Sequence, residues 1–169
     1  MRAVVVYESL WGNTAAVARA IAEGIGSEAR ALSTAEAVGD ALAGVDLLVA
    51  GAPAHYHLLP SAKSRATAAT NPGELGPPDL SHPPMREWLA GLPRGRGKGH
   101  SAAFDTSIAG FWGGGATPRI RRGLKRAGYR PVVKSRDFII ETDTGMLREG
   151  ELEQARAWGV QIAAALRES

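Results

Sequence analysis

The sequence predicts a single α/β domain, a doubly wound five-stranded parallel sheet with helices on both faces. Three observations support this class. The length of 169 residues suits one domain. The apolar runs at 3–7 and 45–50 lack alternation, which is typical of strands covered on both faces. Segments with a helical period of apolar residues separate the strands, as in parallel sheets with helical crossovers.

The first half of the chain predicts a β-α-β-α-β order. Its elements are a strand at 3–7, a helix at 13–26, a weaker strand at 28–32, a short helix starting near Ser33 and Thr34, and a strand at 45–50. The helix at 13–26 places Ala16, Val17, Ala20, Ile21 and Ile25 on one side, with Arg19 and Glu23 opposite. One apolar stripe of this kind covers one face of a sheet.

The second half continues the alternation. It predicts a helix at 85–92, a strand at 100–104, a helix at 117–127, extended segments at 129–133 and 138–141, and a helix at 149–166. Pro118 suits the first turn of its helix, and Gly128 ends it. The stretch 61–82 is broken by Pro and Gly, so we interpret it as an irregular surface excursion within one domain spanning 1–169.

Composition excludes several classes of protein. The chain has no cysteine, so disulfides, thiolate metal sites and cysteine nucleophiles are excluded. The N-terminus enters a strand at once instead of showing a signal peptide, and no apolar run approaches the ~20 residues of a membrane helix. A cytoplasmic protein without a membrane span is therefore expected.

Charge is distributed unevenly along the chain, whose formal net charge is +3. Residues 1–85 carry five basic and eight acidic side chains, whereas residues 86–169 carry fifteen and nine. Eight of the basic residues lie between Arg119 and Arg136. Such a cluster can attract a nucleic acid, an anionic cofactor or an acidic partner. Because no nucleic-acid recognition motif accompanies it, we interpret it as a solvated helix face and expect no nucleic-acid partner.

The loop after the first strand carries the pattern of an anion site. Ser9 and Thr14 supply hydroxyls, Asn13 an amide, and Gly12 a sharp turn into the helix. The first N–H groups of a helix have no carbonyl partner and attract anions. The loop has one glycine and no lysine, which excludes a Walker loop and a dinucleotide fingerprint at this position.

The segment from Val5 to Thr14 resembles the N-terminal phosphate-binding signature of flavodoxins, hydroxyl-x-x-Gly-Asn-Thr after a buried strand. The order of elements is similar to that family along essentially the whole chain. The resemblance implies a flavodoxin-like fold with strand order 2-1-3-4-5 and a non-covalently bound FMN. It also implies that the FMN phosphate contacts Ser9, Gly12, Asn13 and Thr14 together with the backbone amides of Leu10 and Trp11.

Two further loops match the family loops that cover the flavin ring. After the third strand, Gly51 to Leu58 resembles the family's Gly-x-Pro-Thr-aromatic pattern, with Ala54 where a hydroxyl residue is often found. Stacking on the ring would fall to His55 or Tyr56. His55 and His57 lack further ligands nearby in the sequence, so no metal is expected. The residues of this loop implied to contact FMN are Ala52, Pro53, Ala54, His55 and Tyr56.

The loop after the fourth strand would cover the other face of the ring. The resemblance implies that main-chain groups near Asp105 and Thr106 meet the pyrimidine edge, and that Phe111 or Trp112 covers the ring. Three consecutive glycines follow at 113–115, which suits a close approach of backbone to ligand.

The leading hypothesis is an FMN-binding redox protein that transfers electrons to a partner protein or a small quinone-like acceptor. An FMN-dependent oxidoreductase similar to quinone reductases or protoporphyrinogen oxidases is the alternative, and a binding protein that has lost FMN is the third. No acid–base pair is recognisable among Asp105, His55 and His57, which favours the carrier and leaves catalytic residues unassigned. This chain is basic, whereas typical flavodoxins are acidic, and its oligomeric state stays open.

Overall fold

The computed structural model describes residues 1–54, 58–70, 75–109, 115–142 and 145–168. Its centre is one sheet in the order β2-β1-β3-β4-β5, in which every paired strand is parallel. The predicted doubly wound α/β fold and strand order are confirmed. The strands are β1 (Ala3–Tyr7), β2 (Ala29–Ser33), β3 (Leu47–Pro53), β4 (His100–Ile108), β5 (Arg130–Pro131) and β6 (Arg136–Ile140).

The fifth position of the sheet is shared by two short strands. β5 pairs with the start of β4 through His100 and Ser101, and β6 pairs with its end from Phe104 to Ile108. The chain leaves the edge between them. The two extended segments expected at 129–133 and 138–141 therefore occupy one edge, with shorter and shifted bounds.

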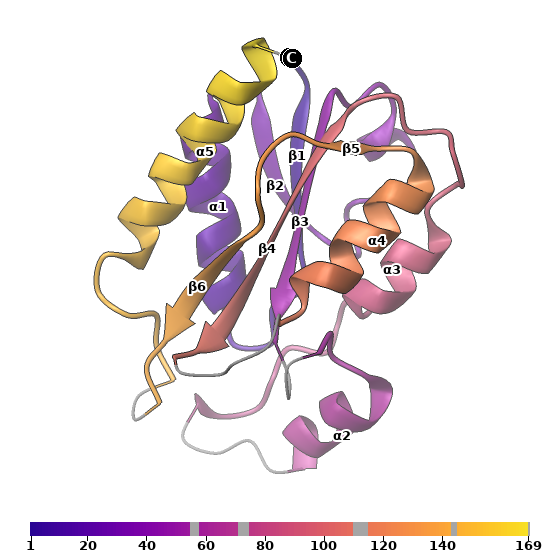
Figure 1. Ribbon diagram of the computed structural model, residues 1–169. Helices are drawn as coiled ribbons and strands as arrows, with labels where there is room; N and C mark the ends of the chain where they lie inside the picture. The colour runs from indigo at the N-terminus through magenta and orange to yellow at the C-terminus, as the bar shows by residue number, and fades with distance from the viewer. Residues whose placement is uncertain (55–57, 71–74, 110–114, 143–144, 169) are drawn as a thin grey trace.

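Helices cover both faces of the sheet (Figure 1). On one face lie α1 (Asn13–Ile25) and α5 (Glu151–Arg167), and on the other lie α3 (Met85–Gly91) and α4 (Thr117–Ala127). The helix α2 (Ala62–Thr70) stands beyond the carboxyl end of β3, beside the loops where ligands bind in doubly wound sheets. None of the helices in the described part of the chain combines the length and apolar composition needed to cross a bilayer.

Side chains on the two faces of β1 belong to two separate hydrophobic cores. Val5 packs with α1 and α5, whereas Val4 and Val6 pack with α3 and α4. In the first core, Phe104, Phe138 and Trp158 make mutual edge-to-face contacts with ring centroids 6.1–6.5 Å apart. Burying each such side chain contributes roughly 1.5–3 kcal/mol. The continuous apolar runs of β1 and β3 follow from this two-sided burial.

Four expectations from the sequence need correction. The stretch 61–82 contains a regular helix, α2, although it was expected to be irregular. The short helix expected near Ser33 and Thr34 is replaced by turns and a 3-10 helix, η1 (Gly39–Leu42). β3 continues to Pro53 and β4 to Ile108, so Ala52, Pro53, Asp105 and Thr106 lie in strands and not in loops.

Candidate functional site

The turn between β1 and α1 presents the start of a helix at the carboxyl end of the sheet. Gly12 adopts φ 94°, a conformation that glycine accepts without strain, and its amide donates to Ser9 Oγ at 3.1 Å. The first intrahelical bond runs from the Ala16 amide to the Gly12 carbonyl. The amides of Asn13 to Ala15 therefore have no carbonyl one turn earlier, and the first turn holds no acidic residue. This arrangement suits an anion.

The polar side chains predicted to contact phosphate form hydrogen bonds with other residues of the protein. The Thr14 hydroxyl lies 2.8 Å from the Thr106 hydroxyl, and both residues are buried. Asn13 Nδ2 donates to the Gly145 carbonyl at 2.7 Å. These side chains fix the turn to β4 and to the segment before α5. The groups best placed for an anion are consequently the backbone amides at the start of α1.

Leu10 and Trp11 join the same turn to the segment before α3. The Leu10 carbonyl accepts the Asp79 amide at 2.8 Å, and Trp11 Nε1 donates to the Gly76 carbonyl at 3.0 Å. The Leu10 side chain is buried. The segment 75–84 thus packs along the predicted phosphate loop.

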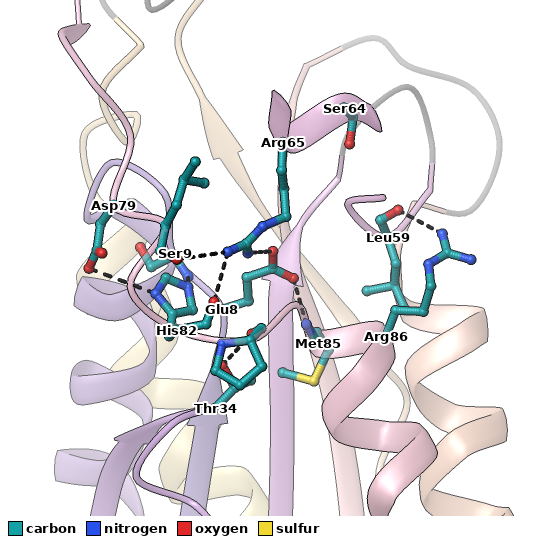
Figure 2. A network of polar contacts seen from close by, with 12 residues as sticks. Glu8, Ser9, Thr34, Leu59, Ser64, Arg65, Asp79, His82, Met85 and Arg86 are labelled. Atoms are coloured by element: carbon teal, nitrogen blue, oxygen red, sulfur yellow. Dashed lines mark hydrogen bonds and ion pairs between the residues drawn. The ribbon is translucent and has the colours of Figure 1, made fainter. Parts of the chain in front are cut away.

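A buried ion pair lies beside this loop, where Arg65 points from α2 toward Glu8 (Figure 2). Glu8 is fully buried and Arg65 of α2 nearly so, and Arg65 Nη1 donates to Glu8 Oε1 at 2.5 Å. The second carboxylate oxygen of Glu8 accepts the Met85 amide at 2.8 Å, and Arg65 Nη2 donates to the His82 carbonyl at 2.7 Å. Glu8 therefore connects β1 to both α2 and α3. Sequence reasoning did not identify Arg65 or His82 as part of the site.

His82 supports the loop through its imidazole. Its Nε2 accepts the Ser9 amide at 3.2 Å, which requires a neutral ring, and its Nδ1 lies 3.8 Å from Asp79 Oδ2. Burial and then the nearby Arg65 charge lower the pKa of His82, which favours this neutral form. Burial raises the pKa of Glu8, while the Met85 amide and Arg65 oppose that rise.

The other two predicted flavin loops are described only at their bases. Ala52 and Pro53 are buried in β3, and the Ala54 amide donates to the Thr106 carbonyl at 2.9 Å. This bond ties the bases of the two loops together. The predictions for His55, Tyr56, His57, Phe111 and Trp112 concern residues outside those that the structure describes.

Asp105 anchors the start of α4. Its buried carboxylate accepts the Ala116 amide at 2.7 Å through Oδ2, whereas Oδ1 has no hydrogen-bond partner in the described part of the chain. On β6 the exposed Asp137 is its register neighbour. Burial, reinforced by the Asp137 charge, raises the pKa of Asp105 to about 7. The main chain of Asp105 and Thr106 lies in the strand ladders with β3 and β6.

Gly115 packs against this carboxyl group, so Gly115→Ala is expected to destabilise the fold. Its φ is +45°, and a Cβ there would lie 2.0 Å from Asp105 Oδ2. The free energy of unfolding from urea titration should fall by about 2–4 kcal/mol. The control is Gly44→Ala, where φ is +64° but the space is open, and a loss of about 1 kcal/mol is expected. Equal losses would show that backbone strain alone accounts for the effect.

A groove of 620 Å³ lies away from these loops, between η1 and α3. Its lining includes Trp88, Leu92 and Tyr129, but no residue that was predicted to bind the cofactor. Among the described residues, no group of three His, Asp or Glu side chains could hold a metal ion.

Similarity to known proteins is found in the structure and not in the sequence. No family model matches the chain, and no curated protein matches its sequence. A flavodoxin from the domain Archaea superposes with a TM-score of 0.65 at 22% identity, covering 99% of both chains. A flavodoxin, WrbA-like protein from Agrobacterium tumefaciens gives 0.60 at 21% identity, covering 99% of this chain and 98% of that one.

The likeness extends to a domain of a larger protein. The Flv1 flavodiiron core from Synechocystis sp. PCC6803 gives a TM-score of 0.61 at 18% identity, and the match covers 99% of this chain but 36% of that one. These similarities agree with the strand order of the sheet. The chain has the flavodoxin-like fold.

Proposed function

We propose that this chain binds FMN non-covalently at the loops after β1, β3 and β4 and transfers electrons through it. The start of α1 carries the proposal, because its amides are free of intrahelical partners and Gly12 turns the chain into them. No acidic residue occupies the first turn to repel a phosphate, and Glu8 nearby is paired with Arg65. The solved structures with the same fold include proteins described as flavodoxins.

Each part of the chain has a distinct task in this proposal. The bound flavin supplies the redox chemistry. The amides at the start of α1 bind its phosphate, and the Thr14–Thr106 contact keeps the turn against β4. The bond from the Ala54 amide to the Thr106 carbonyl sets the spacing of the two loops that would flank the ring. A redox protein partner or a small quinone-like acceptor would receive the electrons.

The quinone-reductase alternative would need groups that manage protons beside the flavin. The titratable group near the loop bases with a strongly raised pKa is Asp105, which is buried and bonded to the Ala116 amide. This carboxyl group already accepts a hydrogen bond from the start of α4. Among the described residues, electron transfer is therefore better supported than proton transfer to a substrate.

A charge placed at the start of α1 tests phosphate binding there. Asn13→Asp puts a carboxylate on the first helical residue, whereas Asn13→Ala removes the same bond to Gly145 without adding charge. We expect FMN to bind the Asp variant at least tenfold more weakly than the Ala variant, about 1.4 kcal/mol, because like charges repel. Titration of apoprotein followed by flavin fluorescence measures this difference.

Riboflavin provides the control, since it lacks the phosphate and should bind both Asn13 variants alike. An equal loss of riboflavin affinity would place the phosphate elsewhere. If the unmodified protein binds no FMN, the proposed function is wrong, and a binding protein that has lost the flavin becomes the better description.

A further inference from the structure

Four arginines surround a groove between α3 and α4. The groove has a volume of 290 Å³, and its remaining lining is apolar or small. None of its described lining residues is acidic. The lining consists of Leu59, Arg86, Leu89, Ala90, Arg119, Arg122, Gly123 and Arg126.

Close packing of the two helices gathers these charges. On α4, Gly123 faces α3 so closely that a Cβ there would lie 2.8 Å from Leu89 Cδ2. Arg119, Arg122 and Arg126 are spaced three and four residues apart and flank that glycine, so they share this side of the helix. Like charges at this spacing repel one another. An anion in the groove would relieve that repulsion.

The charge of Arg86 acts on the buried Glu8 carboxylate, which is already paired with Arg65. Arg86 Nη2 donates to the Leu59 carbonyl at 3.0 Å, and Arg126 Nη2 donates to the Leu89 carbonyl at 2.5 Å. These bonds orient two guanidinium groups but leave most of their donors unused. Across the described ranges, no ion pair joins any of the four arginines to a carboxylate. The positive charge of the groove is therefore available to a ligand.

The groove also lies close to the proposed flavin loops. Leu59 comes shortly after β3, and Arg119 is in the first turn of α4, whose start is held by Asp105 at the carboxyl end of the sheet. The exposed Arg121 and Lys125 lie on the other side of α4, toward β5, where they line a separate hollow. Four guanidinium groups contributed by two helices exceed what a single phosphate needs and match several carboxylates on an acidic surface.

We propose that the arginine groove between α3 and α4 binds the acidic surface of a protein redox partner. Guanidinium groups bind carboxylates through paired hydrogen bonds, and the surrounding charge would speed encounter with an acidic protein. The redox role of that partner rests on the proposed function, whereas the acidic character of the ligand rests on the groove alone.

The test uses a fluorescein-labelled deca-glutamate peptide and the full chain without FMN, followed by fluorescence anisotropy at low ionic strength. The variant Arg119→Gln/Arg122→Gln removes two groove charges whose side chains have no hydrogen bond or ion pair to another described residue. Its matched control, Arg30→Gln/Arg167→Gln, removes two exposed charges on β2 and α5. We expect the groove variant to bind the peptide about fivefold more weakly than the control variant does.

If both variants lose the same affinity for the peptide, binding depends on net charge alone, and the proposal that the groove is the binding site is overturned. Inorganic pyrophosphate is the competitor. If it displaces the peptide at micromolar concentration and loses affinity in the groove variant alone, the groove is a phosphate site and the proposal is also overturned.

The FMN affinity of both variants, measured separately, is expected to equal that of the unmodified protein. If the protein binds no FMN but the peptide still distinguishes the two variants, the proposed function fails while the acidic-ligand site stands. If FMN binds and the peptide does not distinguish them, the groove proposal fails alone.

Discussion

Replacing Arg65 by alanine is expected to lower the free energy of unfolding by about 3–5 kcal/mol, because the change leaves the Glu8 carboxylate buried and unpaired. Arg65 is the charged partner of Glu8 and also donates to the His82 carbonyl. Burial already raises the pKa of Glu8, and loss of the guanidinium raises it further, so Glu8 takes up a proton. Chemical denaturation at neutral pH measures the loss.

Two matched variants show whether burial is the cause. Arg156→Ala breaks an exposed ion pair with Glu23 and should cost less than about 1 kcal/mol. The double variant Glu8→Gln/Arg65→Met removes both charges and should recover much of the stability that Arg65→Ala loses. A loss from Arg65→Ala no larger than that from Arg156→Ala would contradict the argument.

The same residue explains why α2 was missed from the sequence. Ala62–Thr70 carries no apolar stripe, and Arg65 is its buried residue. Its stability comes from the link to Glu8, which lies 57 positions earlier in the chain. A local signal was present, because Ser61 and Ser64 exchange hydrogen bonds between each other's hydroxyl and amide groups, as a capping box does. A capping pair without a hydrophobic period did not suffice to predict the helix.

The strands and the other long helices were predictable because their signals are local. Continuous apolar runs marked β1 and β3, and a one-sided stripe marked α1. The ends of β3 and β4 were not predictable in this way. β4 ends in a polar stretch in which Asp105 bonds to the start of α4 and Thr106 to Thr14. Buried polar residues that bind partners far away in sequence look like loop residues when only neighbours are visible.

The candidate site also has a part that is local in the sequence and a part that depends on distant segments. The β1–α1 turn is one contiguous segment, so its Gly12 and helix start could be found from the sequence. The supports of that turn come from distant segments, namely Arg65 and His82. The arginine groove likewise joins Arg86 of α3 to α4. The basic cluster was visible in the sequence, but its concave shape depends on how the two helices pack.

Asp105 should give the protein a stability that decreases as pH rises toward neutrality. Its folded-state pKa is raised from 3.8 to about 7, so the folded chain binds more protons than the unfolded chain between these values. In that window, this residue lowers the free energy of unfolding by up to roughly 1.4 kcal/mol per pH unit. The contribution is fully present below the unfolded pKa and is lost as pH passes through the folded one.

The variant Asp105→Asn should remove this pH dependence, since an amide oxygen still accepts the Ala116 amide and the side chain no longer ionises. Between pH 5 and pH 7, the stability of the variant relative to the unmodified protein should therefore rise by about 2 kcal/mol, measured by urea denaturation at each pH. The raised pKa of Glu8 acts in both proteins and cancels in this difference. Asp137→Asn removes the neighbouring charge that helps to raise the pKa of Asp105, so it should shift the loss of stability to lower pH. Parallel pH profiles for Asp105→Asn and the unmodified protein would show that Asp105 is already ionised throughout this range.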